Sequence, residues 1–342
     1  MLQCGFFDLD NRYQKLDERD PLTSLNRLVD WEHFRPTLTV VQEKNRKSRA
    51  GRTPYDVVLM FKVLVIQHLY NLSDDESEYQ IKDRYSFCRF LGLTPEGKIP
   101  DAKTIGLFRE QLVEHELMGT LFDDFDEQLN AQGYKARKGQ IVDAGFVDVP
   151  KQRSSRGENE QIKAGEISQR FKDNPNVGRQ KDTDARWAKN NEATHFGYKN
   201  HVAVDNAHKL VREYEVTSAE VHDSQVFIEL LADNTSADVW ADSAYQNENN
   251  EISLAAMERR SPVHKKGNRN NPLSQRSKKS NARRAKTRAR IEPVFGSLTN
   301  EQSGLYSRVI GLARTEVKVG MMNRVYNMRR FVTLCRTDRC AI

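Results

Sequence analysis

The stretch Gly139–Pro150, with the sequence GQIVDAGFVDVP, decides how this chain folds. Apolar and polar residues alternate along it and β-branched residues are frequent, which is typical of a β-strand. Asp143 lies inside its apolar part, IVDA. A carboxylate in a buried strand is costly unless another group pairs with it. The stretch therefore predicts a sheet and marks Asp143 as a residue that needs a partner.

The elements expected downstream follow an order that indicates a fold class. His195–Asp205 and Lys209–Ala219 predict two strands of a hairpin, and Ala237–Tyr245 predicts a short buried strand that carries Asp242. The other expected elements are helices over His222–Leu231, Glu248–Arg259, Lys278–Gly296 and Gly311–Leu334, and an edge strand over Arg260–Lys265. Antiparallel strands followed by an α/β half predict an α/β, ribonuclease-H-like mixed sheet flanked by helices.

Upstream of this sheet the pattern is helical. Thr53 as N-cap with Pro54 predicts a helix to about Tyr70, and Ser73 caps a second helix to about Leu91. Two more helices are expected over Ala102–Leu112 and Glu114–Asn130. The expected organisation is an arm of short helices over residues 1–50, an all-α N-terminal domain over 51–135, and a catalytic domain over 136–342 with a polar, basic insertion at 151–192.

Composition excludes several classes of protein. Of 342 residues, 37% are hydrophobic and 30% charged, and no run approaches the roughly 20 apolar residues that a membrane helix needs. The first residues lack the features of a secretory signal. The four cysteines form no CxxC pair, so a zinc ribbon is disfavoured and reduced thiols in the cytoplasm are expected. Membrane, disordered and disulfide-scaffold classes are thus excluded.

Positive charge is concentrated in one segment. Residues 1–140 carry a net charge of −3 and residues 141–342 carry +9, while Ser261–Arg290 alone carries +11 without a single acid. Such a cluster attracts polyanions, and each neutralised DNA phosphate adds a salt-dependent gain in binding. A solvated basic loop is the alternative. The candidate DNA contacts are Lys265, Lys266, Arg283, Arg284, Lys286, Arg288 and Arg290, with Arg329 and Arg330 of the C-terminal helix, whose arginines are expected on its outer side.

Three acids stand out by their context. Asp143 and Asp242 lie on strands that are neighbours in a ribonuclease-H-like sheet, and Glu292 follows the basic segment on a helix. Converging carboxylates suit hard divalent cations, and two such ions can act on both oxygens of a phosphoryl displacement. Ordinary capped or salt-bridged carboxylates remain the alternative, because the chain has 48 acids.

Several blocks in the same order resemble the bacterial insertion-sequence transposases of the DDE class, most closely the insertion-sequence-five family within the insertion-sequence-four superfamily. They cover almost the whole chain. The blocks are GFFDLDNRYQKL, GRTPYDVVLMFKVLVIQHLYNLSDDESEYQIKDRYSFCRFLGL, IVDAGFVDVPKQRSSRGENEQIKAGE, KDTDARWAKNNEATHFGYKNHVAVD, HDSQVFIELL, VWADSAYQ and RVIGLARTEVKVGMMNRVYNMRRF.

The resemblance implies that Asp143, Asp242 and Glu292 are the catalytic, metal-binding acids. The family's third acid lies in the signature Tyr, two residues, Arg, three residues, Glu, six residues, Lys. Arg288 and Glu292 match it, whereas Ala285 and Thr299 replace the Tyr and the Lys. The neighbouring phosphate contacts therefore differ, and Arg284 or Lys286 are candidates to replace them. Pro293 makes the start of this helix uncertain.

The resemblance also implies a reaction and its partners. Two Mg²⁺ ions, replaceable by Mn²⁺, would support cleavage at the terminal inverted repeats and transfer of the freed 3′-OH into target DNA. The expected partners are these DNAs and, when two ends are paired, a second copy of the chain. The expected location is the bacterial cytoplasm, at the nucleoid. The alternatives are a non-catalytic DNA-binding derivative and a ribonuclease-H-like nuclease without strand transfer.

Several residues keep two interpretations. Lys199, in GYKNH, is a candidate phosphate contact near the first acid, and His201 is expected to be packed. Tyr245 either packs beside Asp242 or touches DNA. Trp187 and Trp240 are expected in the core. The helices of residues 51–135 either bind the terminal repeats or pair two protomers, and their near-neutral charge favours pairing.

Overall fold

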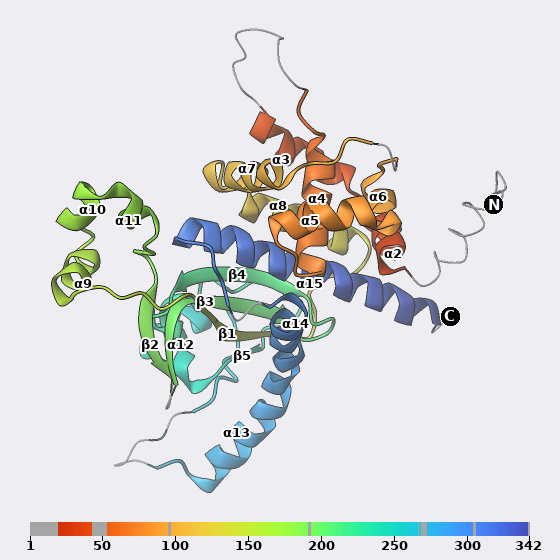
Figure 1. The fold of residues 1–342 in the computed structure, drawn as a ribbon. Helices are drawn as coiled ribbons and strands as arrows, with labels where there is room; N and C mark the ends of the chain where they lie inside the picture. Colours follow the sequence, from red (N-terminus) through yellow and green to blue (C-terminus); the bar gives the residue numbers. More distant parts are fainter. Residues whose placement is uncertain are drawn as a thin grey trace. The chain divides into compact units, whose positions relative to one another are not determined.

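The computed structural model describes residues 20–42, 53–94, 97–190, 193–265, 267, 272–303 and 306–340 (Figure 1). The chain divides into two compact units. The first, the helical unit, comprises residues 1–133 with 324–342, and the second, the sheet unit, comprises residues 134–323. The end of the C-terminal helix thus belongs with the N-terminal helices, whereas the sequence assigned it to the catalytic domain. No helix among the described residues is long and apolar enough to cross a membrane.

The helical unit is built around the apolar helix α4 (Val57–Leu69). Asp56 is its N-cap, accepting from the backbone N–H groups of Val58 and Leu59, so the expected cap Thr53 was wrong. Ser73 does cap the next helix, but that helix ends at Asp83, and a new one starts at Tyr85. The other described helices are α2 (Pro21–Leu28), η1 (Glu32–Phe34), α3 (Arg35–Thr39), η2 (Val40–Gln42), α5 (Asp74–Asp83), α6 (Tyr85–Leu91), α7 (Ala102–Glu114) and α8 (Met118–Ala131).

The last helix, α15 (Leu312–Cys340), has residues in both units. In the helical unit its Phe331 packs edge-on against Phe125. Arg324 is fully buried there, donating from Nη2 to the Met118 carbonyl and lying 5.5 Å from the Phe61 ring centroid. The arginines of this helix were expected outside, and for Arg324 that expectation was wrong, because aromatic faces and a carbonyl surround its guanidinium.

The sheet unit contains the strands β1 (Gln140–Asp148), β2 (Arg186–Asn190), β3 (Ala193–Asp205), β4 (Val211–Ser218) and β5 (Val239–Trp240). β1 pairs antiparallel with β3 on one side and parallel with β5 on the other, and β4 pairs antiparallel with β3. The expected adjacency of the strands that carry Asp143 and Asp242 is therefore confirmed. The expected edge strand at 260–265 is reduced to a single bridge, Asp238 to Arg260.

Each face of this sheet is covered by its own apolar cluster. Val142 and Ala203 pack on one face with Phe227, Tyr245 and, from α12 (Glu248–Ala256), Leu254. Val147, Tyr198 and Val216 pack on the opposite face with Val319 of α15. On that second face the amides of Asn200 and Asn323 donate to each other at 3.0 and 3.1 Å, which fixes the register of α15 on β3.

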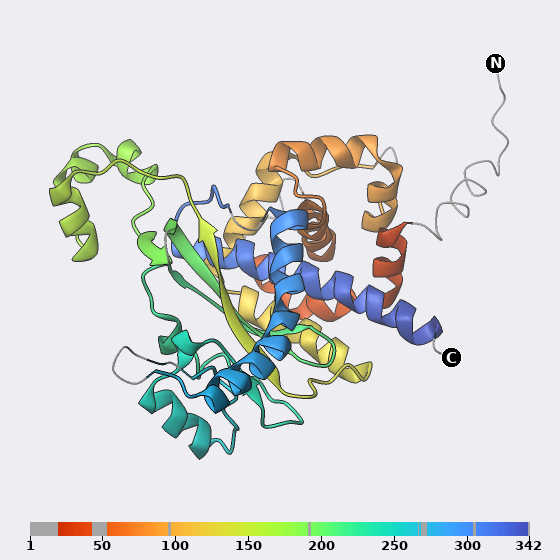
Figure 2. The same cartoon turned by 90° about the horizontal axis from the view of Figure 1, so that it is seen from below.

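The insertion differs from the polar loop that its composition predicted. It forms α9 (Arg156–Lys163), α10 (Gln169–Asp173), α11 (Pro175–Arg179) and then β2, and the three helices lie away from the sheet (Figure 2). Ser155 and Glu158 form a capping box at the start of α9. Trp187 of β2 is 53% exposed, so its expected place in the core was wrong.

Two further helices differ from expectation. The segment expected to be helical over 222–231 forms only a short 3₁₀ turn, η3 (Asp223–Gln225). The helix expected over 278–296 is three elements, α13 (Gln275–Arg288), η5 (Ala289–Ile291) and α14 (Glu292–Gln302). The break precedes Pro293, whose ring cannot occupy a helix interior without losing a hydrogen bond.

Candidate metal centre and nucleic-acid interface

Asp143 and Asp242 lie at the same level of two neighbouring strands. The parallel register of β1 and β5 pairs Ile141 with Trp240, and each acid is the second residue after that pair. Asp143 continues along β1, whereas Asp242 is the N-cap of the 3₁₀ turn η4 (Ser243–Tyr245), accepting from the Ser243 N–H at 2.7 Å. The fold therefore brings together the two acids that the sequence singled out.

Burial and nearby charges act differently on the two carboxyls. Burial raises the pKa of Asp143 to about 6, helped by the charges of Asp242 and Asp223 and opposed by Arg288 and the Ala144 N–H. Burial also acts to raise the pKa of Asp242, but the Ser243 N–H and the Arg288 guanidinium outweigh it, so that pKa is lowered. A carboxyl titrating near neutrality beside an ionised one is typical of functional sites.

Arg288 and His264 contact Asp242 directly. Arg288, the last residue of α13, places Nη1 3.1 Å from Asp242 Oδ1, and Nδ1 of His264 lies 3.6 Å from the same oxygen. Burial and the charge of Arg288 lower the pKa of His264, so its imidazole is neutral at pH 7. Sequence reasoning missed His264, whose only signal was its place at the start of the basic segment.

Another acid, Asp223 of η3, lies close enough to Asp143 for its charge to raise the pKa of that carboxyl. Its carboxylate accepts from Lys199 Nζ at 2.7 Å, and the same ammonium donates to the Val221 carbonyl at 2.8 Å. Lys199, a candidate DNA contact, is 9% exposed and engaged within the protein. Asp223 lies in the block HDSQVFIELL of the resemblance.

Tyr245 is the last residue of η4, the turn that Asp242 caps. It is 1% exposed, and its ring packs 5.2 Å from the Phe227 ring centroid. Burial and the charges of Asp223, Asp143 and Asp242 raise the pKa of its phenol well above the usual value. Of the two interpretations, the structure has Tyr245 packed beside Asp242, and the ring is closed to DNA.

Glu292 stands apart from the aspartates. It is the first residue of α14 and is exposed, and no contact joins it to Asp143 or Asp242 among the described residues. The helix itself packs on β1 at Gly145. A Cβ added at Gly145 would lie only 2.8 Å from Cε1 of Phe295, so the absence of a side chain there lets the ring approach the strand. Glu292 is thus carried by a helix that packs two residues beyond Asp143.

The donor set fits a divalent cation in part. Asp143 and Asp242 offer carboxylate oxygens, the ligands that Mg²⁺ and Mn²⁺ prefer. Within the described ranges, however, no group of three or more His, Cys, Asp or Glu side chains converges enough to hold a metal ion. The Arg288 guanidinium supplies the positive charge that compensates Asp242 in this arrangement.

α13 presents the basic segment. None of its residues is buried, and it contains no acid. Its exposed cations are Arg276, Lys278, Lys279, Arg283 and Lys286. Asn281 fixes the helix to the preceding segment, exchanging hydrogen bonds with the backbone N–H and carbonyl of Lys265 at 3.1 and 2.9 Å. A solvated helix with five outward cations is an electrostatic surface for a polyanion.

The other predicted DNA contacts have varied surroundings. Arg284 donates to the Val263 carbonyl, and Arg290 donates to Asn206 Oδ1 at 2.7 Å. Lys265 is exposed, and Arg329 and Arg330 are half-buried on α15. Lys266 lies outside the described residues. Arg284 and Arg290 thus make contacts within the sheet unit, and Arg283, Lys286 and Arg290 are exposed to solvent.

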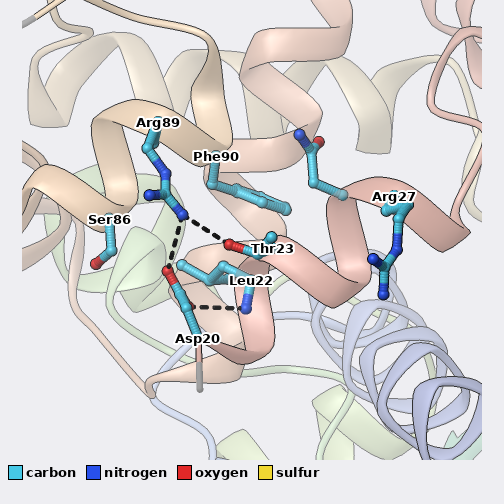
Figure 3. A pocket seen from close by; sticks show the side chains of 8 residues that line it. Asp20, Leu22, Thr23, Arg27, Ser86, Arg89 and Phe90 are labelled. Atoms are coloured by element: carbon cyan, nitrogen blue, oxygen red, sulfur yellow. Dashed lines mark hydrogen bonds and ion pairs between the residues drawn. The ribbon is translucent and has the colours of Figure 1, made fainter. Parts of the chain in front are cut away.

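The helical unit contains a pocket of about 350 Å³ between α2 and α6 (Figure 3). Asp20, Arg27, Arg89 and Phe90 are among the side chains that line it. The Asp20 carboxylate accepts from the Leu22 N–H at 3.0 Å and lies 3.8 Å from Arg89, which also donates to Thr23. These contacts cap α2 and join it to α6, a structural role.

The strand order β2-β3-β1-β5, with β4 also paired to β3 and with acids at one level of β1 and β5, defines a ribonuclease-H-like domain, and the helical N-terminal region accompanies it. Residues 134–328 match the family described as Transposase DDE domain, and residues 10–111 match the one described as Transposase domain (DUF772). The chain therefore belongs to the DDE transposase family. A solved structure, the cryo-EM piggyBac transposase synaptic complex with hairpin DNA, is similar over 92% of this chain and 74% of that one, with 11% identity and a TM-score of 0.46.

Membership in this family implies polynucleotidyl transfer on DNA, a reaction for which DDE transposases generally use divalent metal ions.

Proposed function

We propose that this protein is the transposase of an insertion sequence of the insertion-sequence-five family. It binds the terminal inverted repeats, cleaves the phosphodiester at each end and joins the freed 3′-OH to target DNA. The observation that carries the proposal is that Asp143 and Asp242 lie at one level of β1 and β5, each the second residue after the Ile141–Trp240 pair, and that Arg288 at the end of the basic helix α13 contacts Asp242.

Asp143, Asp242 and Glu292 are the proposed ligands of two Mg²⁺ ions, for which Mn²⁺ can substitute. Bound there, the ions would activate the attacking oxygen and stabilise the charge that develops on the phosphate. The carboxylates act as ligands and not as proton donors, so Asp143 must be ionised when the site is loaded. For Asp242 to bind a metal ion, its salt bridge with Arg288 must break. The Arg288 guanidinium would then pair with a DNA phosphate, an anion whose geometry suits it.

DNA is held mainly by α13 in this proposal. Arg283 and Lys286 are its exposed members among the predicted contacts, and Arg288 connects the helix to the metal centre. Two ends must be cut together, so the active form is a homodimer at the bacterial nucleoid. The helices of residues 51–135 recognise the repeats, pair the protomers or do both.

The test is cleavage of the element's own ends. The purified protein is incubated with DNA carrying the sequences that flank its gene, in Mg²⁺ or Mn²⁺ and in EDTA. Metal-dependent cleavage at the ends with joined products is expected. Cut products without joining would indicate a nuclease without strand transfer, and salt-sensitive binding without cleavage would indicate a non-catalytic DNA-binding derivative. Either result would contradict the transposase proposal.

Neutralising α13 is expected to weaken DNA binding strongly. The variant has Lys278, Lys279, Arg283 and Lys286 replaced by Gln, and its affinity for DNA at 0.1 M salt should fall roughly 10²-fold. The slope of log K against log salt should become less steep by about 2 or more, since each phosphate contact contributes about 0.9 to it. Fluorescence anisotropy with end DNA at several salt concentrations measures both.

The matched control removes the same charge from the insertion, with Arg156, Lys163, Lys172 and Arg179 replaced by Gln. This control variant should bind within a few-fold of the original protein. An equal loss in both variants would show that net charge, and not α13, holds the DNA.

A further inference from the structure

Asp242 lies where the sheet no longer holds it. β5 is two residues long, and its pairing with β1 ends at Trp240. On the side of β5 away from β1, the backbone N–H of His264 donates a hydrogen bond to the Ala241 carbonyl at 3.2 Å. Asp242 then starts the turn η4. Because a loop carboxylate has no ladder to fix it, other contacts must set its position relative to Asp143.

Asn250 of α12 connects η4, the turn that Asp242 caps, to η3. Its Nδ2 donates to the Tyr245 carbonyl, at the end of η4, and to the Ser224 carbonyl, in η3, both at 3.0 Å. The side chain is nearly buried, at 7% exposed, and its own backbone N–H is capped by Asn247 Oδ1 at 2.7 Å. A buried amide that uses both donor hydrogens joins the two turns into one unit.

The turn η3 is in turn fixed to the sheet. Asp223 and the Val221 carbonyl both accept from Lys199 Nζ, and Lys199 belongs to β3, the strand that pairs with β1 along its whole length. A continuous series of polar contacts therefore runs from β3 through η3 and Asn250 to η4. It ends three residues from Asp242 and begins beside the strand that carries Asp143.

We propose that Asn250 is a positioning residue, which holds Asp242 at the level of Asp143 so that both carboxylates can bind one divalent cation. This inference rests on the proposed metal-dependent function. Asn250 touches neither acid, and it acts through the backbone of η4. Groups behind the ligands of a metal site typically change metal affinity by about 10–100-fold when they are removed.

The test measures Mn²⁺ binding to the full-length protein without DNA, by the loss of the free-ion EPR signal. Asn250→Leu has a similar shape and no donors, and Mn²⁺ should bind about 10–100-fold more weakly to it. Cleavage by this variant should recover as Mn²⁺ is raised, which a general loss of structure would not allow. Asn250→Gln keeps the amide but places it one methylene further from the backbone, so a loss of Mn²⁺ affinity smaller than that of Asn250→Leu is expected.

Asn234→Leu is the matched control. Asn234 also makes several bonds, accepting from the Gly139 and Ser236 N–H groups at 2.9 and 3.1 Å and donating to the Gly139 carbonyl at 3.0 Å, but these lie at the start of β1. Its Mn²⁺ affinity should stay within about twofold of the original protein's.

Two outcomes would overturn the inference, and they differ. If Asn250→Leu and Asn250→Gln fold and bind Mn²⁺ like the original protein, while Asp242→Asn does not, Asn250 has no positioning role and the metal site stands. If Asp242→Asn itself binds Mn²⁺ normally, the proposed metal site fails, and the role of Asn250 fails with it. Thermal unfolding of each variant establishes that it is folded.

Discussion

Asp143→Asn is expected to abolish metal-dependent cleavage of DNA, by at least about 10³-fold, because it removes an anionic ligand from the proposed centre. It keeps the shape of the side chain and the acceptor for the Ala144 N–H. End cleavage in Mg²⁺ and Mn²⁺ measures the loss. A variant that still cleaved within tenfold of the original rate would exclude Asp143 as a metal ligand.

The same variant is expected to be more stable than the original protein at neutral pH. Burial raises the pKa of Asp143 from 3.8 to about 6, so the ionised carboxylate costs folding free energy above pH 6. This pKa difference corresponds to at most about 3 kcal/mol in the free energy of unfolding. Because the group is only half-buried, screening by solvent reduces the expected gain in stability to about 1–2 kcal/mol. A gain in stability with a loss of activity is typical of a functional site.

The pH dependence has a definite sign. Between about pH 4 and 6 the folded protein binds a proton at Asp143 that the unfolded chain has released, so the cost appears as pH rises through this window. The Asp143→Asn variant has no proton to lose there and avoids this cost. Its stability advantage should be full at about pH 7.5 and should vanish near pH 4. Denaturant unfolding of both proteins at both pH values measures it.

Glu292→Gln is expected to abolish end cleavage to a similar degree but to leave Mn²⁺ binding by the DNA-free protein within about twofold. The reason is its position: Glu292 is exposed and has no contact with Asp143 or Asp242 in the described part of the chain. In this view Glu292 reaches the centre only when DNA displaces Arg288 from Asp242. Cleavage assays and Mn²⁺ titration with and without end DNA separate the two effects.

Glu301→Gln tests whether the effect belongs to the position. Glu301 lies on the same helix, α14, and its carboxylate accepts a hydrogen bond from the Ser297 hydroxyl. Its loss should leave cleavage nearly unchanged. Normal cleavage by Glu292→Gln would mean that another residue supplies the third ligand, and weakened DNA-free Mn²⁺ binding would mean that Glu292 already lies in the centre before DNA binds.

The parts of the fold that the sequence predicted well depend on local patterns. Alternation predicted β1, β3 and β4 within a few residues, because a strand with distinct faces has a period of two. Ser73 was predicted as a cap and acts as one, since an N-cap bond spans only three residues.

The misses have physical reasons of two kinds. The insertion looked like a loop because it is polar, but its capping box and the Arg156–Glu160 pair are local helix-stabilising features that composition does not count. Val226, Phe227 and Leu230 have helical spacing, yet they pack into the sheet's core cluster from the turn that follows η3. For these residues tertiary burial outweighed the helical pattern.

The candidate site divides in the same way. The sequence singled out Asp143 and Asp242 and indicated that their strands are neighbours, because an acid within an apolar strand is conspicuous in one dimension and the order of elements restricts the sheet. It also located the basic segment that forms α13.

Only the tertiary structure decided which groups surround those acids. Asp223 comes from η3, His264 from the irregular segment before α13 and Asn250 from α12, and none of them is conspicuous in the sequence. The packing of these segments also decides the salt bridges of Arg288 with Asp242 and of Lys199 with Asp223. It decides as well that Tyr245 is buried and that Glu292 is exposed. Local sequence determines backbone period and caps over a few residues, whereas side-chain contacts between distant segments depend on the packing of the whole domain.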